Sequence, residues 1–204
     1  ISAADGGIAN LMAANNSPVL AALREHGTAA QKRRFFPKLT TGEMIGCIAL
    51  TEPHTGSDAA AIRTRAERRG DYFVLNGHKS FITAGRRAGV VMIVAVTDPD
   101  AGKRGISTFL TPTDNPGYKV LREEAKLGHR TNDTCAIAFE DMMVPATDLL
   151  GAEGRGLGIA LANLSAGRIG VAAQAVGGAR AAFEAALNYA QEREAFGKPI
   201  IERV

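Results

Sequence analysis

The stretch Ile48–Ile62, IALTEPHTGSDAAAI, opens with apolar residues typical of a buried strand and then becomes polar. The eight positions from Thr51 to Asp58 are rich in hydroxyls, carboxylates and turn-forming residues. A plain turn needs about two to five residues, so this loop is longer than a connection alone requires. Gly56 also allows a ligand to approach the backbone closely. The stretch therefore predicts a binding loop at the end of a buried strand.

The composition is that of a globular protein with a mild excess of positive charge. Of the 204 residues 46% are hydrophobic, which argues against disorder. Lys and Arg number 24 against 21 Asp and Glu, giving a net charge of +3. There is no long basic run and only 5% of residues are aromatic, which disfavours a nucleic-acid partner. A small anionic ligand suits the same charge.

The cysteines and histidines predict neither a disulfide nor a metal site. Cys47 and Cys135 lie in apolar, strand-like sequence, which favours reduced core thiols in a cytoplasmic protein. The histidines lack the spacing of metal ligands, and we recognise no signal peptide. Because the chain starts without methionine and its last residues carry no stop signal, we expect it to be a piece of a longer protein.

Three regions with different residue patterns predict an α+β protein with several domains. Residues 1–43 predict the end of an N-terminal helical domain, in which Ser17-Pro18 starts one helix, Gly27 ends it and Thr28 starts the next. Residues 44–155 predict about seven short strands, with hairpin turns at Gly70-Asp71 and Asn76-Gly77. No long helix interrupts these strands, which favours a β-barrel or sandwich over a parallel sheet.

Residues 156–204 predict the beginning of a C-terminal helical bundle. Arg168 is the only charged residue between Arg155 and Arg180. A membrane span is conceivable for an apolar stretch of about twenty residues. The many small residues and the central arginine favour a helix packed in a bundle, so we expect no membrane partner. Arg168 is then either a structural ion-pair partner or a contact in a ligand pocket, and Pro199 is predicted to end or bend the helix.

Six segments, in the same order along the chain, resemble the acyl-CoA dehydrogenase family. They are GTAAQKRRFFPKLTTGE (27–43), IALTEPHTGSD (48–58), LNGHKSFITAG (75–85), KLGHRTNDTCAIAFEDMMVP (126–145), GRIGVAAQAVGGARAAFEAALNYAQERE (167–194) and FGKPI (196–200). The resemblance implies an FAD-containing oxidoreductase of fatty acid metabolism that acts on an acyl-CoA thioester. It also implies a homotetramer and an electron-transfer flavoprotein as the electron acceptor.

The resemblance also assigns roles to residues at matching positions. The Thr51 hydroxyl lies near the pyrimidine end of the flavin, Phe81 packs on the ring, and the Thr83 hydroxyl reaches N5. Arg193 and Phe196 reach the FAD of a neighbouring subunit. The implied cofactor-binding residues are Ile48, Leu50, Thr51, Gly56, Ser57, Phe81, Ile82, Thr83, Arg193 and Phe196, and the implied substrate-binding residues are Ser57, Ser165 and Arg168.

The implied reaction is α,β-desaturation, in which a carboxylate removes the α-proton and the β-hydrogen leaves as hydride to flavin N5. Some family members carry the base just before the helix arginine, but here that position is Gly167. The resemblance therefore places no catalytic residue in this chain, and we expect the fragment alone to be inactive. Two alternatives stay open: a non-dehydrogenating enzyme of the same fold, such as a desulfinase, or a base-less relative that binds acyl-CoA or flavin.

The chain departs from the family pattern at four places. His54 stands where glycine is usual, Ser165 where an acid is frequent, and Ala195 where a hydroxyl or amide is common. The tail Glu202-Arg203-Val204 fits the family's next FAD contact poorly.

Overall fold

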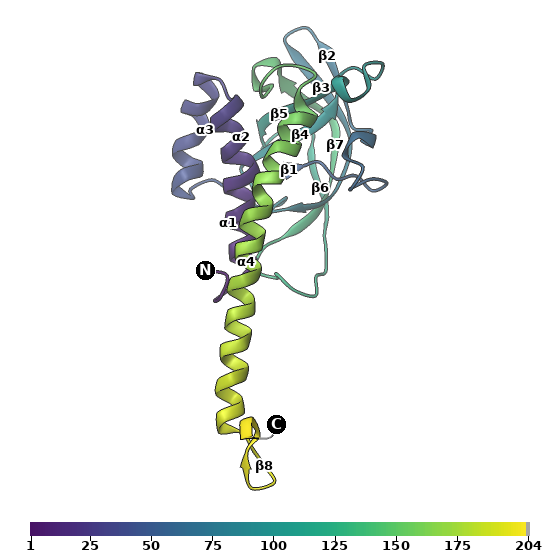
Figure 1. The fold of residues 1–204 in the computed structure, drawn as a ribbon. Helices are drawn as coiled ribbons and strands as arrows, with labels where there is room; N and C mark the ends of the chain where they lie inside the picture. Colours follow the sequence, from purple (N-terminus) through teal and green to yellow (C-terminus); the bar gives the residue numbers. More distant parts are fainter. Residues whose placement is uncertain (203–204) are drawn as a thin grey trace.

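The computed structural model of the chain describes residues 1–202, so the predicted departure at Arg203 and Val204 lies outside the described residues. Four consecutive helical segments form the N-terminal part: α1 (Gly6–Ala14), η1 (Asn15–Leu20), α2 (Ala21–His26) and α3 (Ala29–Thr41). Figure 1 shows them beside the first half of α4 (Gly156–Glu192). Short 3-10 turns follow elsewhere: η2 (Ala59–Ala61), η3 (Gly102–Gly105), η4 (Ala146–Asp148) and η5 (Ile200–Glu202).

The caps of the N-terminal helices follow from the sequence, with one exception. Thr28 and Gln31 form the capping box that begins α3, and Gly42, at φ 78°, ends it. Ser17 leaves the helical path at φ −144° and ψ 115°. Two helices meet at this break, so the predicted helix start at Ser17-Pro18 is confirmed. The Ser17 hydroxyl, however, donates to the Asn163 carbonyl of α4 over 3.1 Å, so the predicted role of that hydroxyl as a cap is wrong. Contact with α4 has replaced the local cap.

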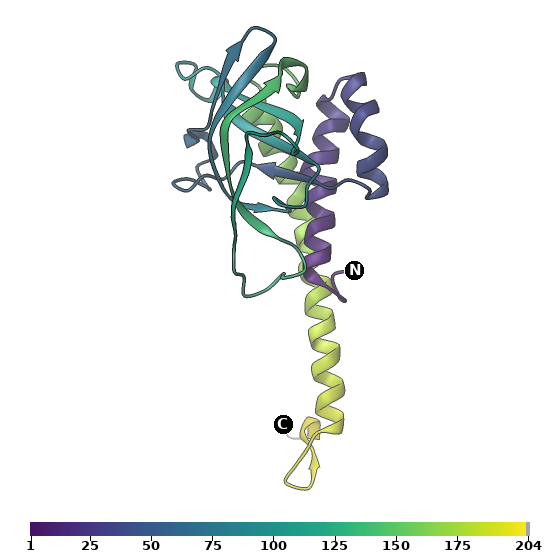
Figure 2. The same ribbon diagram turned by 180° about the vertical axis from the view of Figure 1, so that it is seen from behind.

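Seven strands form one curled sheet in the middle of the chain (Figures 1 and 2). β4 (Val90–Val96) pairs in parallel with β1 (Gly46–Ala49) and antiparallel with β5 (Ile106–Pro112). The order then continues from β4 through β2, β3 and β7 to β6. Their bounds are β2 (Arg65–Arg69), β3 (Tyr72–Thr83), β6 (Tyr118–Glu123) and β7 (Thr134–Pro145). The predicted α+β architecture with a middle β-barrel or sandwich domain is confirmed in the form of this curled sheet.

One of the two predicted hairpin turns is wrong. β2 and β3 form the hairpin around Gly70-Asp71, but Asn76-Gly77 lies within β3, where the register with β7 shifts. Asn76 exchanges two hydrogen bonds with Asp141, at 3.0 and 2.9 Å. Because pairing with β7 continues on both sides, the Asn-Gly pair lies inside the strand. The β-bulge is in β7, where Glu140 and Asp141 lie opposite Asn76.

The curled sheet buries hydrophobic residues on both of its faces. Phe73, Phe109 and Phe139 lie in the core within the curl. Val19, Leu23, Phe35, Leu110 and Ile159 fill a second core between the sheet and the helices. The second core fixes the start of α4 against the sheet, and this junction positions the candidate site.

α4 is packed at its start and extends away from the rest of the chain further on (Figures 1 and 2). Within residues 1–202 it is the one helix long and apolar enough for a membrane span, and 28% of its most apolar window is buried. Core helices of soluble proteins can be equally long and apolar, although such helices are mostly buried. The helix ends at Glu192, and Pro199 lies in a small hairpin of β8 (Glu194–Ala195) and β9 (Lys198–Pro199). The prediction that Pro199 ends the helix is therefore wrong.

Candidate functional site

A cavity of about 320 Å³ opens where the end of β1, the end of β3 and α4 meet. It brings together nine of the twelve site residues that the sequence suggested. The lining residues are Ala14, Ile48, Leu50, Thr51, Gly56, Ser57, Ala59, Phe81, Ile82, Thr83, Leu161, Leu164 and Arg168. Segments about 30 and 80 residues apart in the sequence thus form one concave surface, with apolar walls and several hydroxyl groups.

The loop after β1 is held in shape by its own hydrogen bonds. Glu52 and Thr55 exchange backbone bonds of 2.9 and 3.1 Å, and the Thr55 hydroxyl donates to the Asp58 carbonyl over 2.6 Å. Ser80 N–H donates to the Thr51 carbonyl over 2.9 Å, which joins the loop to β3. A Cβ at Gly56 would meet only the Thr51 side chain, at 3.6 Å. The backbone at Gly56 is therefore open to a ligand.

Phe81 has a backbone conformation that is costly for an aromatic residue. Its φ is 59°, at the point where the register between β3 and β7 shifts. Its side chain is 65% exposed although it lines the cavity. Such strain persists where the surrounding structure imposes it, and it is enriched at ligand sites. Here the irregular strand end turns an aromatic ring into the cavity instead of the core.

A buried ion pair lies behind the loop. Lys79 Nζ is 2.9 Å from Glu52 Oε1, and these side chains are 0% and 3% exposed. Burial raises the pKa of Glu52, but the Lys79 charge and a hydrogen bond from Arg63 outweigh it, so the pKa lies below its ordinary 4.5. Burial lowers the pKa of Lys79 to about 8, which the Glu52 charge only partly offsets. Both groups are charged at neutral pH.

Sequence reasoning missed this pair, although the sequence contains a signal for it. Phe73 and Leu75 alternate as inward-facing positions of β3, and Lys79 continues the same alternation. A lysine at an inward position requires a buried acceptor, and Glu52 is an acid within the predicted loop. The apolar lining residues Leu161 and Leu164 were also missed, because only the packing of α4 brings them to the cavity.

Arg168 lines the cavity from α4 and lies at its exposed side. Among residues 1–202 no carboxylate forms an ion pair with it, so the chain described here offers no structural salt bridge for this arginine. Its head group is therefore available to a ligand.

Three of the suggested residues lie outside this cavity. Ser165 is exposed on α4 and does not line it. Arg193 and Phe196 lie at the far end of α4, in the β8–β9 segment (Figure 1). The structure does not bring them to this chain's own cavity, and their contact with a neighbouring subunit stays a prediction.

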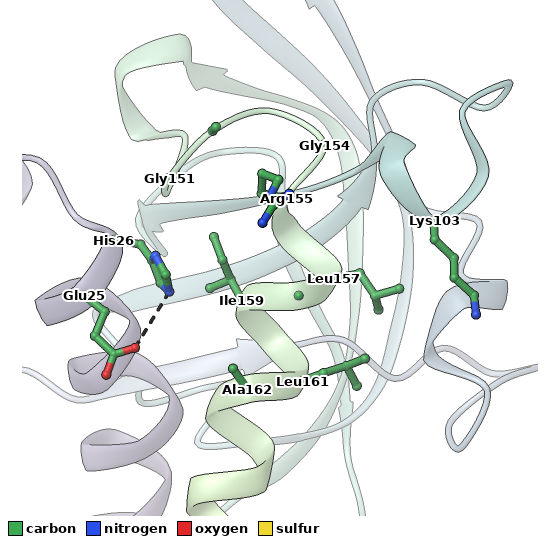
Figure 3. A pocket seen from close by; sticks show the side chains of 12 residues that line it. Glu25, His26, Lys103, Gly151, Gly154, Arg155, Leu157, Ile159, Leu161 and Ala162 are labelled. Atoms are coloured by element: carbon green, nitrogen blue, oxygen red, sulfur yellow. Dashed lines mark ion pairs between the residues drawn. The ribbon is translucent and has the colours of Figure 1, made fainter.

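A larger cavity, of about 710 Å³, lies beside the first turns of α4. Figure 3 shows His26 and Glu25 on one side of the helix and Lys103 on the other. Glu25 and His26 approach to 3.8 Å. None of the suggested site residues lines this cavity, although Leu161 borders both.

Comparison with known proteins places these features in a family. Profiles described as the N-terminal, middle and C-terminal domains of acyl-CoA dehydrogenases match residues 1–43, 47–142 and 154–203, respectively. The chain belongs to the acyl-CoA dehydrogenase family.

Individual relatives of this family agree with the profiles. An acyl-CoA dehydrogenase of Bacillus subtilis is 47% identical over 174 residues, covering 85% of this chain and 46% of the relative. Butyryl-CoA dehydrogenase of Megasphaera elsdenii superimposes with a TM-score of 0.96 at 39% identity, covering 99% of this chain and 53% of that one. A glutaryl-CoA dehydrogenase of Mycobacterium smegmatis, solved in complex with FADH2, superimposes with a TM-score of 0.87 at 37% identity. This match covers 95% of this chain and 48% of that one. The chain thus spans about half the length of the relatives it matches.

The acyl-CoA dehydrogenase cofactor, FAD, can be tested against the cavity itself. The Thr51, Ser57 and Thr83 hydroxyls supply polar groups, the Gly56 backbone is open, and the Phe81 ring is held at the cavity without being buried. These are the features that a planar ring system with a polar edge requires. The residues present fit part of such a cofactor.

Proposed function

We propose that the intact protein uses FAD to desaturate an acyl-CoA thioester between its α- and β-carbons. The observation that carries the proposal is the cavity where the Leu50–Ser57 loop meets the strained Phe81–Thr83 strand end. Two segments to which the family resemblance assigned flavin contacts thus form two walls of one site. Membership of the acyl-CoA dehydrogenase family supports the same function.

The residues of this chain would bind and orient the two reactants. Thr51 and Thr83 would donate hydrogen bonds to the polar edge of the flavin, and Phe81 would pack on its ring. Gly56 and Ser57 would bind the pyrophosphate through backbone and hydroxyl groups. When bound, FAD supplies the hydride acceptor. Thr51 follows β1 and Thr83 ends β3, so donors fixed at these two positions would stabilise negative charge on the flavin without reorganising.

Arg168, with Ser57 and Ser165, would bind the acyl-CoA. The cavity lining includes the Arg168 guanidinium but no carboxylate. The base that removes the α-proton is therefore not among these lining residues. We propose that it is a glutamate supplied by sequence outside this chain, in which case the 204 residues alone are inactive.

The remaining parts of the proposal concern the oligomeric state, the electron acceptor and the location of the enzyme. We propose a homotetramer, in which Arg193 and Phe196 reach a neighbouring subunit's FAD, and an electron-transfer flavoprotein as the acceptor. Their support is the resemblance of the segments around these residues to the family. A cytoplasmic location is proposed on the basis of the free, buried thiols of Cys47 and Cys135.

The test is an anaerobic titration of the intact protein. Purified protein should show flavin absorbance, and adding an acyl-CoA should bleach it as the flavin is reduced. A protein that is colourless and cannot be reconstituted with FAD would overturn the proposal. A flavoprotein that binds acyl-CoA without bleaching would instead support the non-dehydrogenating alternative, because binding would be present without hydride transfer.

A further inference from the structure

The Glu52–Lys79 ion pair joins the two walls of the cavity from behind. Neither side chain lines the cavity, and both are almost completely buried. Their charged groups meet at 2.9 Å. An effect on a ligand would therefore have to pass through the backbone segments that the two side chains hold.

Glu52 closes the loop. Its carboxylate accepts hydrogen bonds from Arg63 N–H over 2.7 Å and from Thr64 N–H over 2.9 Å. Gly56 and Ser57, which line the cavity, lie between Glu52 and these two donors in the sequence. The carboxylate thus fixes where the loop leaves β1 relative to where it returns to β2.

Lys79 fixes the other wall. Its ammonium donates to the Leu50 carbonyl over 3.0 Å and to the Val94 carbonyl over 2.8 Å, in addition to Glu52. Leu50 lines the cavity, and Lys79 itself precedes the strained Phe81 by two residues. All three ammonium protons therefore have acceptors, and they connect β3 with the ends of β1 and β4.

We propose that Glu52 and Lys79 are positioning residues for the bound flavin, which set the separation between the Gly56–Ser57 wall and the Phe81–Thr83 wall. The inference rests on the proposed function, because it concerns the same cofactor. A hydrophobic pair of similar volume would stabilise the fold as well as a buried ion pair or better. The ion pair also fixes the orientation of the backbone segments around it, because its four further hydrogen bonds could not be made by methylene groups.

The experiment removes both charges at once, in the intact protein. Glu52→Gln combined with Lys79→Met keeps similar volumes and leaves no unpaired buried charge. We expect a thermal midpoint below that of wild type, because the Leu50 and Val94 carbonyls lose a donor, but above that of Lys79→Met alone. The FAD dissociation constant should rise by about tenfold or more, and the flavin absorption spectrum should show less resolved fine structure. Glu153→Gln is the matched control, because it breaks an ion pair of similar length, 2.8 Å to Arg68, that is exposed and distant from the cavity. Its FAD affinity and spectrum should equal those of wild type.

The outcomes separate this inference from the proposed function. If wild type binds FAD and the double variant binds it equally well with an unchanged spectrum, the pair is merely structural and the inference is overturned. If wild type binds no FAD, the proposed function fails first. Should the double variant not fold, Glu52→Asp alone decides: it keeps the charge opposite Lys79 and shortens the reach of the carboxylate by one methylene. An unchanged FAD affinity and spectrum in this variant would likewise overturn the inference.

Discussion

The loop at 51–62 and the distal half of α4 differ in whether the chain itself satisfies or buries their side chains. The loop is polar, and the chain satisfies it internally: the Glu52 carboxylate has three donors and is 3% exposed. The distal half of α4 is apolar, and the chain leaves it uncovered: Ile169 is 76% exposed, Val176 70% and Phe183 65%. Exposed apolar surface on this scale marks a contact with something else.

The difference shows which contacts of the site this chain makes by itself. The loop wall and the strand-end wall of the cavity are held together by hydrogen bonds whose partners all lie within residues 50–94. The far end of α4 has few side-chain bonds to other residues. One of them, the Arg180–Glu184 ion pair at 2.7 Å, joins two residues of the helix itself. A helix that is apolar on most sides is normally buried. Substitutions in the loop should therefore alter stability even in this chain alone. Substitutions in distal α4 should alter stability only in a protein in which other residues pack on that helix.

The largest effect is expected for Lys79→Met. The substitution leaves the Glu52 carboxylate buried without its counter-charge, which typically costs about 3–5 kcal/mol of unfolding free energy. The measurement is a chemical denaturation of the intact protein. Glu153→Gln, which breaks the exposed Arg68 pair, should cost less than about 1 kcal/mol. Equal losses in both variants would mean that burial does not distinguish the two pairs.

The same contrast explains what the sequence could and could not predict. The strand, the loop and the Phe81–Thr83 segment are local patterns, and nine suggested residues meet in one cavity. The Asn76-Gly77 turn failed because its context is tertiary: a Cβ at Gly77 would lie 2.8 Å from Thr64 Cα, where β2 begins. That close approach requires a glycine within the strand, and an Asn-Gly pair alone cannot reveal it. The predicted Ser17 cap failed for the same reason, since its partner lies 146 residues away.

The second prediction concerns distal α4. In this chain Phe183 makes few contacts that its truncation could remove, so Phe183→Ala alone would change stability by less than about 0.5 kcal/mol. If the helix is packed in a bundle in the intact protein, the same variant should cost about 3 kcal/mol or more there. Denaturation of the intact protein decides, with Glu184→Ala on the adjacent position as control. A loss below about 0.5 kcal/mol would contradict the bundle.

The third prediction moves to the junction of the two regions, at Arg168. Arg168→Met keeps much of the side chain's volume and removes the charge. Because no described carboxylate pairs with Arg168, stability should change little, while acyl-CoA binding should weaken by roughly one to two orders of magnitude for a lost charge-assisted hydrogen bond. The denaturation midpoint and acyl-CoA affinity are measured on the same intact sample. A large stability loss with unchanged affinity would reverse this assignment.

The fourth prediction concerns how the stability of the protein changes at acidic pH. The pKa of Glu52 is lower in the folded chain than its ordinary 4.5, so the unfolded state binds more protons between these values. The contribution of Glu52 to stability is therefore complete above about pH 4.5 and is lost as the pH falls through the folded pKa. Lys79, with a pKa of about 8, stays charged throughout this range. Glu52→Gln should flatten this acidic part of the stability curve, and an unchanged slope would show that other carboxylates dominate it.

The smallest effect is expected for His54, which stands where the family usually has glycine. Its Nε2 lies 3.0 Å from the Ala61 carbonyl and 3.8 Å from Glu52 Oε2, so the imidazole adds a second closure to the loop. The side chain is 34% exposed, and losing one such hydrogen bond costs about 1 kcal/mol because water replaces the partner. His54→Ala should therefore lower the denaturation midpoint slightly and weaken FAD binding by no more than about fivefold. If it weakens FAD binding as strongly as the Glu52–Lys79 double variant, His54 and not the buried pair holds the loop, because the imidazole would then be its main closure.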